Sequence, residues 1–239
     1  MINFGILTKL YYACMPMRFV RYHAYRVKKF IELCASNYDR NGVLVLDIGA
    51  GSAGWSDLFS KAKYLAQDIQ QNPVGSINYV CDLCSPEESI PDALADVIIC
   101  TQVLEHIPEP TIAFEQLNRM LKPRGEIYLT THMAFEEHML PHDYWRFTEN
   151  GIKHIALKSG FEVLSFKHHG STAQLIHYLF WSWPIRLFWP ERSGLLYIVY
   201  CALSTPFIIF SGALAIIMDI FDKKPSIYPN FEIIMKKTK

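Results

Sequence analysis

A carboxylate stands beside a glycine-rich turn in the stretch VLVLDIGAGSAGWSDLF, residues 43–59. Asp47 ends an apolar run, and Gly49, Gly51 and Gly54 follow it with the spacing G-x-G-x-x-G. Glycines in such a turn let backbone N–H groups come close to a bound nucleotide. A carboxylate at the same turn repels a pyrophosphate and attracts a cationic group. The stretch therefore predicts a nucleoside ligand with positive charge, and S-adenosylmethionine, which carries a sulfonium and an ammonium group, has that chemistry.

Two further carboxylates end apolar stretches downstream. Asp68 ends YLAQD, and Asp82 follows YVC and precedes Leu83. Asp68 is placed to accept hydrogen bonds from both ribose hydroxyls, and Asp82 from an adenine amino group while Leu83 packs on the ring. Taken singly, each aspartate is more simply interpreted as an ordinary turn residue. Three acids at the ends of three consecutive predicted strands indicate one shared site, because ligands of open α/β sheets lie beyond those ends.

The elements that must position these residues alternate along the chain. Apolar runs predict strands, and segments with helical periodicity between them predict helices. The pattern favours a parallel sheet covered by helices on both faces. The predicted strands are 43–47, 64–68, 77–81, 96–101, 126–131 and 161–167, with a last one in NFEIIMKK, and the predicted helices are 54–61, 111–121 and 149–158.

These stretches together resemble the class I S-adenosylmethionine-dependent methyltransferases, in particular the group called type 11. The resemblance covers roughly residues 43–167 and is carried by VLDIGAGSAG, AQDI, CDL, ADVIICTQVLEHIPEP, LNRMLKPRGEIYLTTH and LPHDYWRFTENGIKHIALKSGFEV. It implies a Rossmann-like three-layer α/β/α sandwich: a seven-stranded, mostly parallel sheet whose last strand runs antiparallel between strands five and six. It also implies S-adenosylmethionine as the cofactor, lined by Asp47, Gly49, Ala50, Gly51, Asp68, Ile69, Asp82, Leu83 and Gln102.

The sequence departs from the family pattern in two places. Ala53 stands where a tighter version of the turn has glycine. The link IQQNPVGS is shorter than the dozen or so residues usual for a helical crossover. We therefore expect one helix to be missing on that side of the sheet, which leaves the adenine side more open.

The acceptor end holds several residues that handle protons, in THMAFEEHMLPHDYWRFTENG. His132 directly follows a predicted strand, and His142 with Asp143 is a candidate base with its orienting carboxylate. Alternatively, Asp143 pairs with Arg146 only to fix the loop. A metal site is the rival interpretation, but no compact ligand motif such as H-E-x-x-H is present, so no metal is predicted.

The LEHIPEP stretch is ambiguous. Glu105 and His106 are candidate functional groups, but Pro108 and Pro110 favour a role in ending strand four and starting a helix.

The chain is predicted to have four parts. Residues 1–41 form a basic, amphipathic helical segment, residues 42–170 the methyltransferase core, residues 171–222 an apolar helical insertion between strands six and seven, and residues 223–239 the final strand and a basic tail.

The insertion raises the question of a membrane. Its uncharged run 193–218 exceeds the roughly 20 apolar residues that span a bilayer. A single crossing conflicts with the return of the last strand to the sheet, so a re-entrant hairpin, a helix pair resting in the membrane plane, or a helical cap on the domain remain. We favour membrane contact through residues 173–221, with tryptophans as interfacial anchors and nearby lysines drawn to anionic lipid.

Composition narrows the function classes further. The net charge is zero, with basic ends around an acidic middle, which argues against a nucleic-acid-binding protein. Six scattered cysteines without framework spacing favour a reducing cytoplasm. The sequence predicts a cytoplasmic, membrane-associated enzyme that methylates a small-molecule or lipid-linked acceptor. The alternatives are a non-catalytic membrane-associated protein that binds S-adenosylmethionine, or a nucleotide-dependent oxidoreductase.

Overall fold

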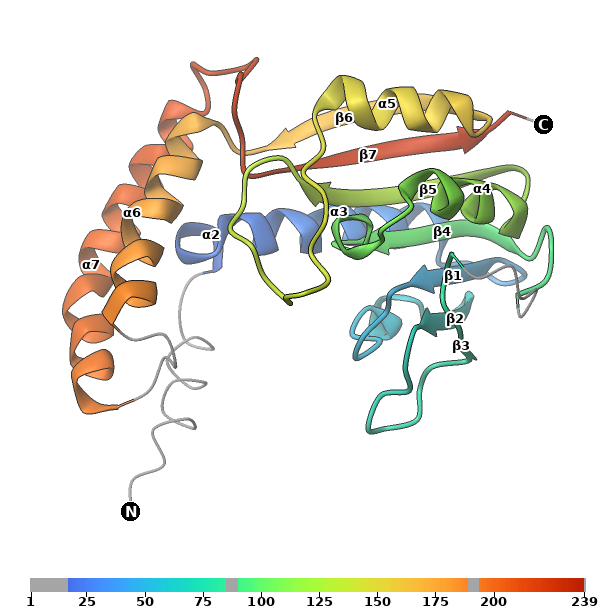
Figure 1. Cartoon of the computed structure of the whole chain (residues 1–239), viewed down its shortest axis with the longest axis horizontal. Coiled ribbons are helices and arrows are strands. Elements are labelled where there is room, and N and C mark those ends of the chain that lie inside the picture. Colours follow the sequence, from blue (N-terminus) through green and yellow to red (C-terminus); the bar gives the residue numbers. More distant parts are fainter. Residues whose placement is uncertain (1–16, 85–89, 189–193, 239) are drawn as a thin grey trace. The chain divides into compact units, whose positions relative to one another are not determined.

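The computed structural model describes residues 17–84, 90–188 and 194–238 of the 239-residue chain. Its centre is a seven-stranded sheet of order β3-β2-β1-β4-β5-β7-β6 (Figure 1). Strands β1 to β5 pair in parallel, and β7 pairs antiparallel with β5, from Glu126 opposite Lys236 to His132 opposite Asn230. The expected seven-stranded sheet with its antiparallel last strand is confirmed. The strands are Leu44–Ile48 (β1), Lys63–Asp68 (β2), Tyr79–Val80 (β3), Ala95–Thr101 (β4), Leu121–His132 (β5), Phe161–His169 (β6) and Asn230–Lys237 (β7).

Helices cover both faces of this sheet. Phe30, Ile31 and Cys34 of α3 pack against one face, on a core that includes Val45 and Val97. Figure 1 shows α4 and α5 on the opposite face. The described α-helices are Met17–Val20 (α2), Tyr22–Tyr38 (α3), Pro110–Met120 (α4), Glu149–Lys158 (α5), Thr172–Phe188 (α6) and Leu195–Met218 (α7), and two 3-10 helices span Ser56–Leu58 (η1) and Leu104–His106 (η2).

Local sequence explains where these helices stop and start. Helix α5 has the predicted bounds, with the Thr148 hydroxyl accepting from Gly151 N at its N-terminus. Gly160 follows it at φ 79°, in the left-handed conformation expected there. Helix α4 begins at Pro110, where the missing N–H of proline has no cost.

The predicted helix 54–61 does not form. The chain instead turns through residues 50–55 and makes only the short η1. The Asp39 carboxylate accepts from Lys61 N at 2.7 Å, Ala62 N at 3.0 Å and Ser60 Oγ at 3.1 Å. These side-chain bonds satisfy the backbone of the loop without a helix, and Phe59 packs into the core beside α3.

Two strand predictions also needed correction. β3 is limited to Tyr79–Val80, where the prediction was 77–81, and β5 begins at Leu121 rather than 126. The β2–β3 link, residues 69–78, contains no helix, as its shortness predicted.

The described chain divides into two compact units. One comprises residues up to Arg26 together with His168–Pro229, and the other comprises Val27–Lys167 with the residues from Asn230 onward. The second unit contains the glycine turn and the candidate acceptor residues. The four-part division expected from the sequence stays a prediction.

Helices α6 and α7 of the first unit pack closely with α2. A Cβ added at Gly212 would lie 2.4 Å from the carbonyl oxygen of Phe19, so this contact between α7 and α2 requires glycine. The His177 ring joins the same helices, with Nε2 3.1 Å from Phe19 O and Nδ1 3.1 Å from Ser211 Oγ. The apolar helical insertion expected between strands six and seven consists of the two helices α6 and α7.

Candidate active site

The glycine turn leaves β1 in a left-handed conformation. Gly49 and Gly51 have φ values of 63° and 54°, and Ala53 adopts 54° without being glycine. A Cβ on Gly49 would lie 2.4 Å from Val103 Cγ2, whereas one on Gly51 would meet no atom within 4 Å. Gly49 thus permits close packing against Val103, two residues after β4, and Gly51 faces open space.

The Asp68 carboxylate reaches this turn from the end of β2. Its Oδ2 accepts from Gly51 N at 2.7 Å, and its Oδ1 accepts from Ile69 N at 2.7 Å. Ile69 itself is exposed. The glycine turn and the end of β2 are therefore joined by hydrogen bonds, and the ribose-binding role of Asp68 stays a prediction.

The neighbouring Gln67 was not predicted. Its side chain is buried, accepts from Gly49 N at 3.2 Å and donates to Cys81 O at 2.7 Å. It thereby fixes the glycine turn to the segment that carries Asp82. The sequence signal was a polar residue in an otherwise buried strand position, which needs partners when it is buried.

Asp47 is almost fully buried and accepts a hydrogen bond from the Tyr64 hydroxyl. The pKa of Asp47 is raised to about 7, chiefly because the carboxyl group is buried; the Tyr64 hydrogen bond opposes this rise and the nearby Asp68 charge adds to it. The acid expected to meet a cation is thus held where its ionisation is costly unless positive charge arrives.

Asp82 and Leu83 follow β3 in a short turn. Asp82 is exposed and accepts from Cys84 N at 2.9 Å, and Leu83 is buried. Cys81 N donates to Asp68 O at 3.0 Å, so Asp82 follows directly on a residue bonded to the second strand end. The predicted sharing of one edge by Asp47, Asp68 and Asp82 agrees with the β1–β2–β3 pairing.

Gln102 joins the end of β4 to β5 and β7. It follows β4 with φ 57°, and its Nε2 donates to Thr130 Oγ1 at 2.8 Å and to Asn230 Oδ1 at 3.4 Å. Its Oε1 is buried and, within the described residues, has no hydrogen-bond partner. Buried acceptors of this kind are normally satisfied, so this oxygen is available to a ligand donor.

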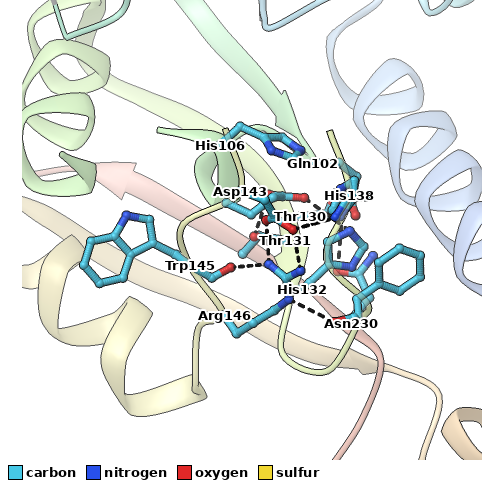
Figure 2. A network of polar contacts seen from close by, with 12 residues as sticks. Gln102, His106, Thr130, Thr131, His132, His138, Asp143, Trp145, Arg146 and Asn230 are labelled. Carbon is cyan, nitrogen blue, oxygen red and sulfur yellow. Dashed lines mark hydrogen bonds and ion pairs between the residues drawn. The ribbon is translucent and has the colours of Figure 1, made fainter. Parts of the chain in front are cut away.

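Figure 2 shows the acceptor-side network, which has His132 near its centre. His132, at the end of β5, places Nε2 3.2 Å from Glu105 Oε1. The other oxygen of Glu105 accepts from Thr131 Oγ1 at 2.8 Å. Both Glu105 and His132 are buried, and burial raises the pKa of Glu105 to about 7. A buried carboxylate beside an imidazole can orient the ring and stabilise its protonated form.

Asp143 binds Arg146 rather than His142, the partner that was predicted. It accepts two hydrogen bonds from Arg146, each 2.8 Å, and one from His138 N at 2.8 Å (Figure 2). The Arg146 guanidinium holds the pKa of Asp143 well below its ordinary value. Arg146 also donates to Phe135 O and Glu136 O. This ion pair fixes the loop after β5, which was the alternative interpretation of Asp143.

The expected pairing of His142 with Asp143 is replaced by other contacts. The His142 ring is exposed and lies beside the Tyr144 hydroxyl, with Nδ1 at 3.1 Å. Its carbonyl oxygen is 2.6 Å from Nδ1 of His106. The structure brings His132 to Glu105 instead, which joins η2 to β5 across strands that are adjacent in the sheet.

Glu105 was left ambiguous by its sequence context. Its segment does end β4 and precede α4, as the prolines indicated, and its carbonyl also accepts from Tyr144 N and Trp145 N. Only the pairing of β4 with β5 reveals that its side chain meets His132.

Comparisons with known proteins identify this architecture. A family model described as a methyltransferase domain matches residues 19–165, more than half of the chain. The chain belongs to this methyltransferase family. Together with the confirmed sheet order, the match makes it a class I S-adenosylmethionine-dependent methyltransferase in fold and family.

Curated relatives of this methyltransferase include the ubiquinone biosynthesis O-methyltransferase of Xanthomonas oryzae pv. oryzae. It is 28% identical over 116 residues, which are 42% of this chain and 48% of the relative. The chain therefore spans about half the length of the curated relatives it matches.

Solved structures similar to the methyltransferase include the 1,6-didemethyltoxoflavin-N1-methyltransferase of Burkholderia thailandensis, with TM-score 0.56, 13% identity, and 91% and 84% of the two chains covered. Phosphoethanolamine N-methyltransferase 2 of Haemonchus contortus gives a TM-score of 0.51 at 17% identity, over 84% of this chain and 50% of that one. The former was crystallised with S-adenosylhomocysteine and the latter with S-adenosyl-L-methionine. At these identities the likeness concerns the fold alone.

Proposed function

We propose that this protein transfers a methyl group from S-adenosylmethionine to a small-molecule acceptor beyond the carboxyl ends of β1, β4 and β5. The observation that carries the proposal is the hydrogen bond between Gly51 N and the Asp68 carboxylate. This bond joins the glycine turn to the carboxylate that we assign to the ribose hydroxyls. An oxidoreductase that binds a dinucleotide is disfavoured, because Asp47 would face a pyrophosphate.

The residues present fit the cofactor. Gly51 faces open space, and the Asp68 oxygens have further lone pairs for ribose hydroxyls beyond the two backbone bonds they accept. Gln102 offers a buried acceptor oxygen, and Asp47 offers a carboxylate that an ammonium would help to ionise. Asp82 and Leu83 stand at the adenine side. When bound, the cofactor supplies an electrophilic methyl group whose leaving group is a neutral thioether.

The protein's own chemistry then concerns the acceptor. Alignment of two reactants alone is worth on the order of 7–11 kcal/mol. A hydroxyl acceptor must also lose its proton, and we assign His132 to receive it at Nδ1, because Nε2 faces the orienting carboxylate of Glu105. The O-methyltransferase relative supports a hydroxyl acceptor. His142 and Asp143, also predicted as catalytic, have other partners; we retain Asp143 only as a positioning residue through Arg146 and His138.

We further propose that the acceptor is lipid-linked or dissolved in a membrane, and that α6 and α7 contact the cytoplasmic side of that membrane. Within the described residues, α7 is the one helix long and apolar enough to cross a bilayer, by length and composition. Large apolar side chains of both helices are exposed, in numbers unusual for a helix pair that faces water. They include Ile176, Phe180, Trp183, Leu187, Leu196, Leu203, Phe207 and Phe210.

The enzyme activity can be tested with cofactor carrying a radiolabelled methyl group and fractionated cell extract. We expect label to enter a lipid-extractable fraction. Label in water-soluble metabolites would support the methyltransferase activity but would refute the proposal of a lipid-linked acceptor. Cofactor binding without transfer to any fraction would favour the non-catalytic alternative.

A further inference from the structure

Two imidazoles and one carboxylate from three segments meet on the acceptor side of the sheet. Glu105 comes from η2, His132 from the end of β5 and His138 from the loop that follows, and one potential ligand atom of each lies within 4.8 Å of the other two. We propose that these side chains bind a divalent transition-metal ion of the zinc type. The proposal deepens the proposed function, because the cation would bind the acceptor hydroxyl.

The donor set is that of catalytic rather than structural zinc sites. Two histidines and a glutamate leave at least one coordination position for water or substrate. Ligand atoms in a tetrahedral site lie about 3.3 Å apart, given bonds of about 2.0–2.1 Å. His132 Nε2 and Glu105 Oε1 are already 3.2 Å apart, so only His138 needs to adjust.

The contacts of Glu105 and His138 are compatible with a cation between them. Thr131 Oγ1 holds one Glu105 oxygen, and the other faces His132. Nδ1 of His138 lies 3.1 Å from Glu136 O and 3.3 Å from Asp143 Oδ2. A proton on Nδ1 satisfies these acceptors and leaves Nε2 for the cation, the usual support of a metal-bound histidine by a carboxylate.

Charge and access agree with a cation at this place. The Glu105 carboxylate is buried beside His132, and the Arg146 guanidinium is bonded to Asp143. Glu105 and His132 are buried, whereas about a quarter of the His138 side chain is exposed, which gives the ion an entry path.

A bound cation would change the role of His132. Coordination uses its basic lone pair, so the cation itself would lower the pKa of a bound acceptor hydroxyl. The hydroxyl oxygen would take the open position and release its proton to water.

The test is a titration of the purified full chain, stripped with a chelator, with Co²⁺ and Zn²⁺ in calorimetry and visible absorption. We expect one tight site per chain, with Co²⁺ bands of a low-coordinate complex, and at least tenfold weaker binding in His138→Gln and in Glu105→Gln. His142→Gln, a change of an exposed neighbouring histidine, should bind as the wild type does.

Absence of a single tight site, or unchanged affinity in His138→Gln, would overturn the metal proposal. Circular dichroism confirms that each variant folds. Because S-adenosylmethionine binding is measured on the same metal-free protein, failure of the metal site and failure of the methyltransferase assignment are distinguished.

Discussion

At the scale of single residues, the buried Asp47 carboxylate lowers the stability of the free protein and prepares the site for a cationic ligand. A carboxylate buried beside Tyr64, with Asp68 nearby, has its pKa raised to about 7 from an ordinary value of 3.8. A folded state that holds this proton more tightly than the unfolded chain loses stability as the pH rises through the interval between those values. We interpret the burial as preparation for a cationic ligand, which would compensate the charge.

Replacing Asp47 by Asn should separate stability from binding. From this group alone, the wild-type free energy of unfolding should fall by on the order of 4 kcal/mol between pH 4 and pH 7, and Asp47→Asn should remove that part of the slope. Urea unfolding at a series of pH values measures it, and taking the difference between the two proteins cancels other groups such as Glu105. The variant should also bind S-adenosylmethionine more weakly. Parallel pH profiles for both proteins would refute the assigned ionisation.

Gly49 and Gly51 form a matched pair, because both have positive φ but differ in their surroundings. Each alanine variant should lose about 1–2 kcal/mol through backbone strain. Gly49→Ala should lose a further 1–3 kcal/mol, roughly, because the new methyl group would overlap Val103. Urea unfolding without ligand measures the difference. Equal losses would mean that the packing of the turn against Val103 does not constrain this position.

At the scale of elements, sequence patterns were sufficient where a segment's own residues decide its structure. The predicted bounds of α5 and the left-handed Gly160 depend on local capping, and the buried strand β4 on a continuous apolar run. The helix predicted at 54–61 does not form: residues 53–59 make short turns, and Asp39 binds the chain at Lys61 and Ala62. Asp39 precedes β1, so no local pattern reveals its contacts.

The candidate site divides in the same way. The places of the three acids and the glycine turn in the fold could be predicted, because each lies at the end of a recognisable strand; their contact with the cofactor stays a prediction. Glu105 and Gln67 could not be assigned, since their partners, His132 and the turn at Gly49, come from other strands of the sheet. The pairing of His142 with Asp143 was inferred from adjacency in sequence, and Arg146 prevails because its guanidinium binds a carboxylate with two hydrogen bonds.

The exposed face of α7 carries its own prediction. Changing Leu203, Phe207 and Phe210 together to Ser should reduce flotation with vesicles that contain anionic lipid by on the order of 100-fold or more, because each apolar side chain buried in lipid contributes roughly 1.5–3 kcal/mol. Val74→Ser with Leu157→Ser, which are equally exposed in the other unit, provides the control and should float normally. Undiminished flotation of the triple variant would exclude this face as the lipid contact.

At the scale of the whole molecule, the two compact units suggest a division of labour. The unit from Val27 to Lys167 with β7 holds both the glycine turn and the acceptor-side network, and the unit with α6 and α7 holds the exposed apolar surface. We propose that the unit with the glycine turn performs methyl transfer and that the unit with α6 and α7 brings the enzyme to its acceptor. Loss of membrane contact should therefore leave cofactor binding intact.

The most direct test of the central claim is calorimetric binding of S-adenosylmethionine to the wild type, to Asp68→Ala and to Asp57→Asn, an exposed carboxylate of η1 that serves as the control. We predict one site per chain in the wild type and in Asp57→Asn. Affinity should fall about 10- to 100-fold in Asp68→Ala, as expected for the loss of hydrogen bonds to a charged group, and NADH should show no binding. Unchanged affinity in Asp68→Ala, or a preference for NADH, would contradict the account.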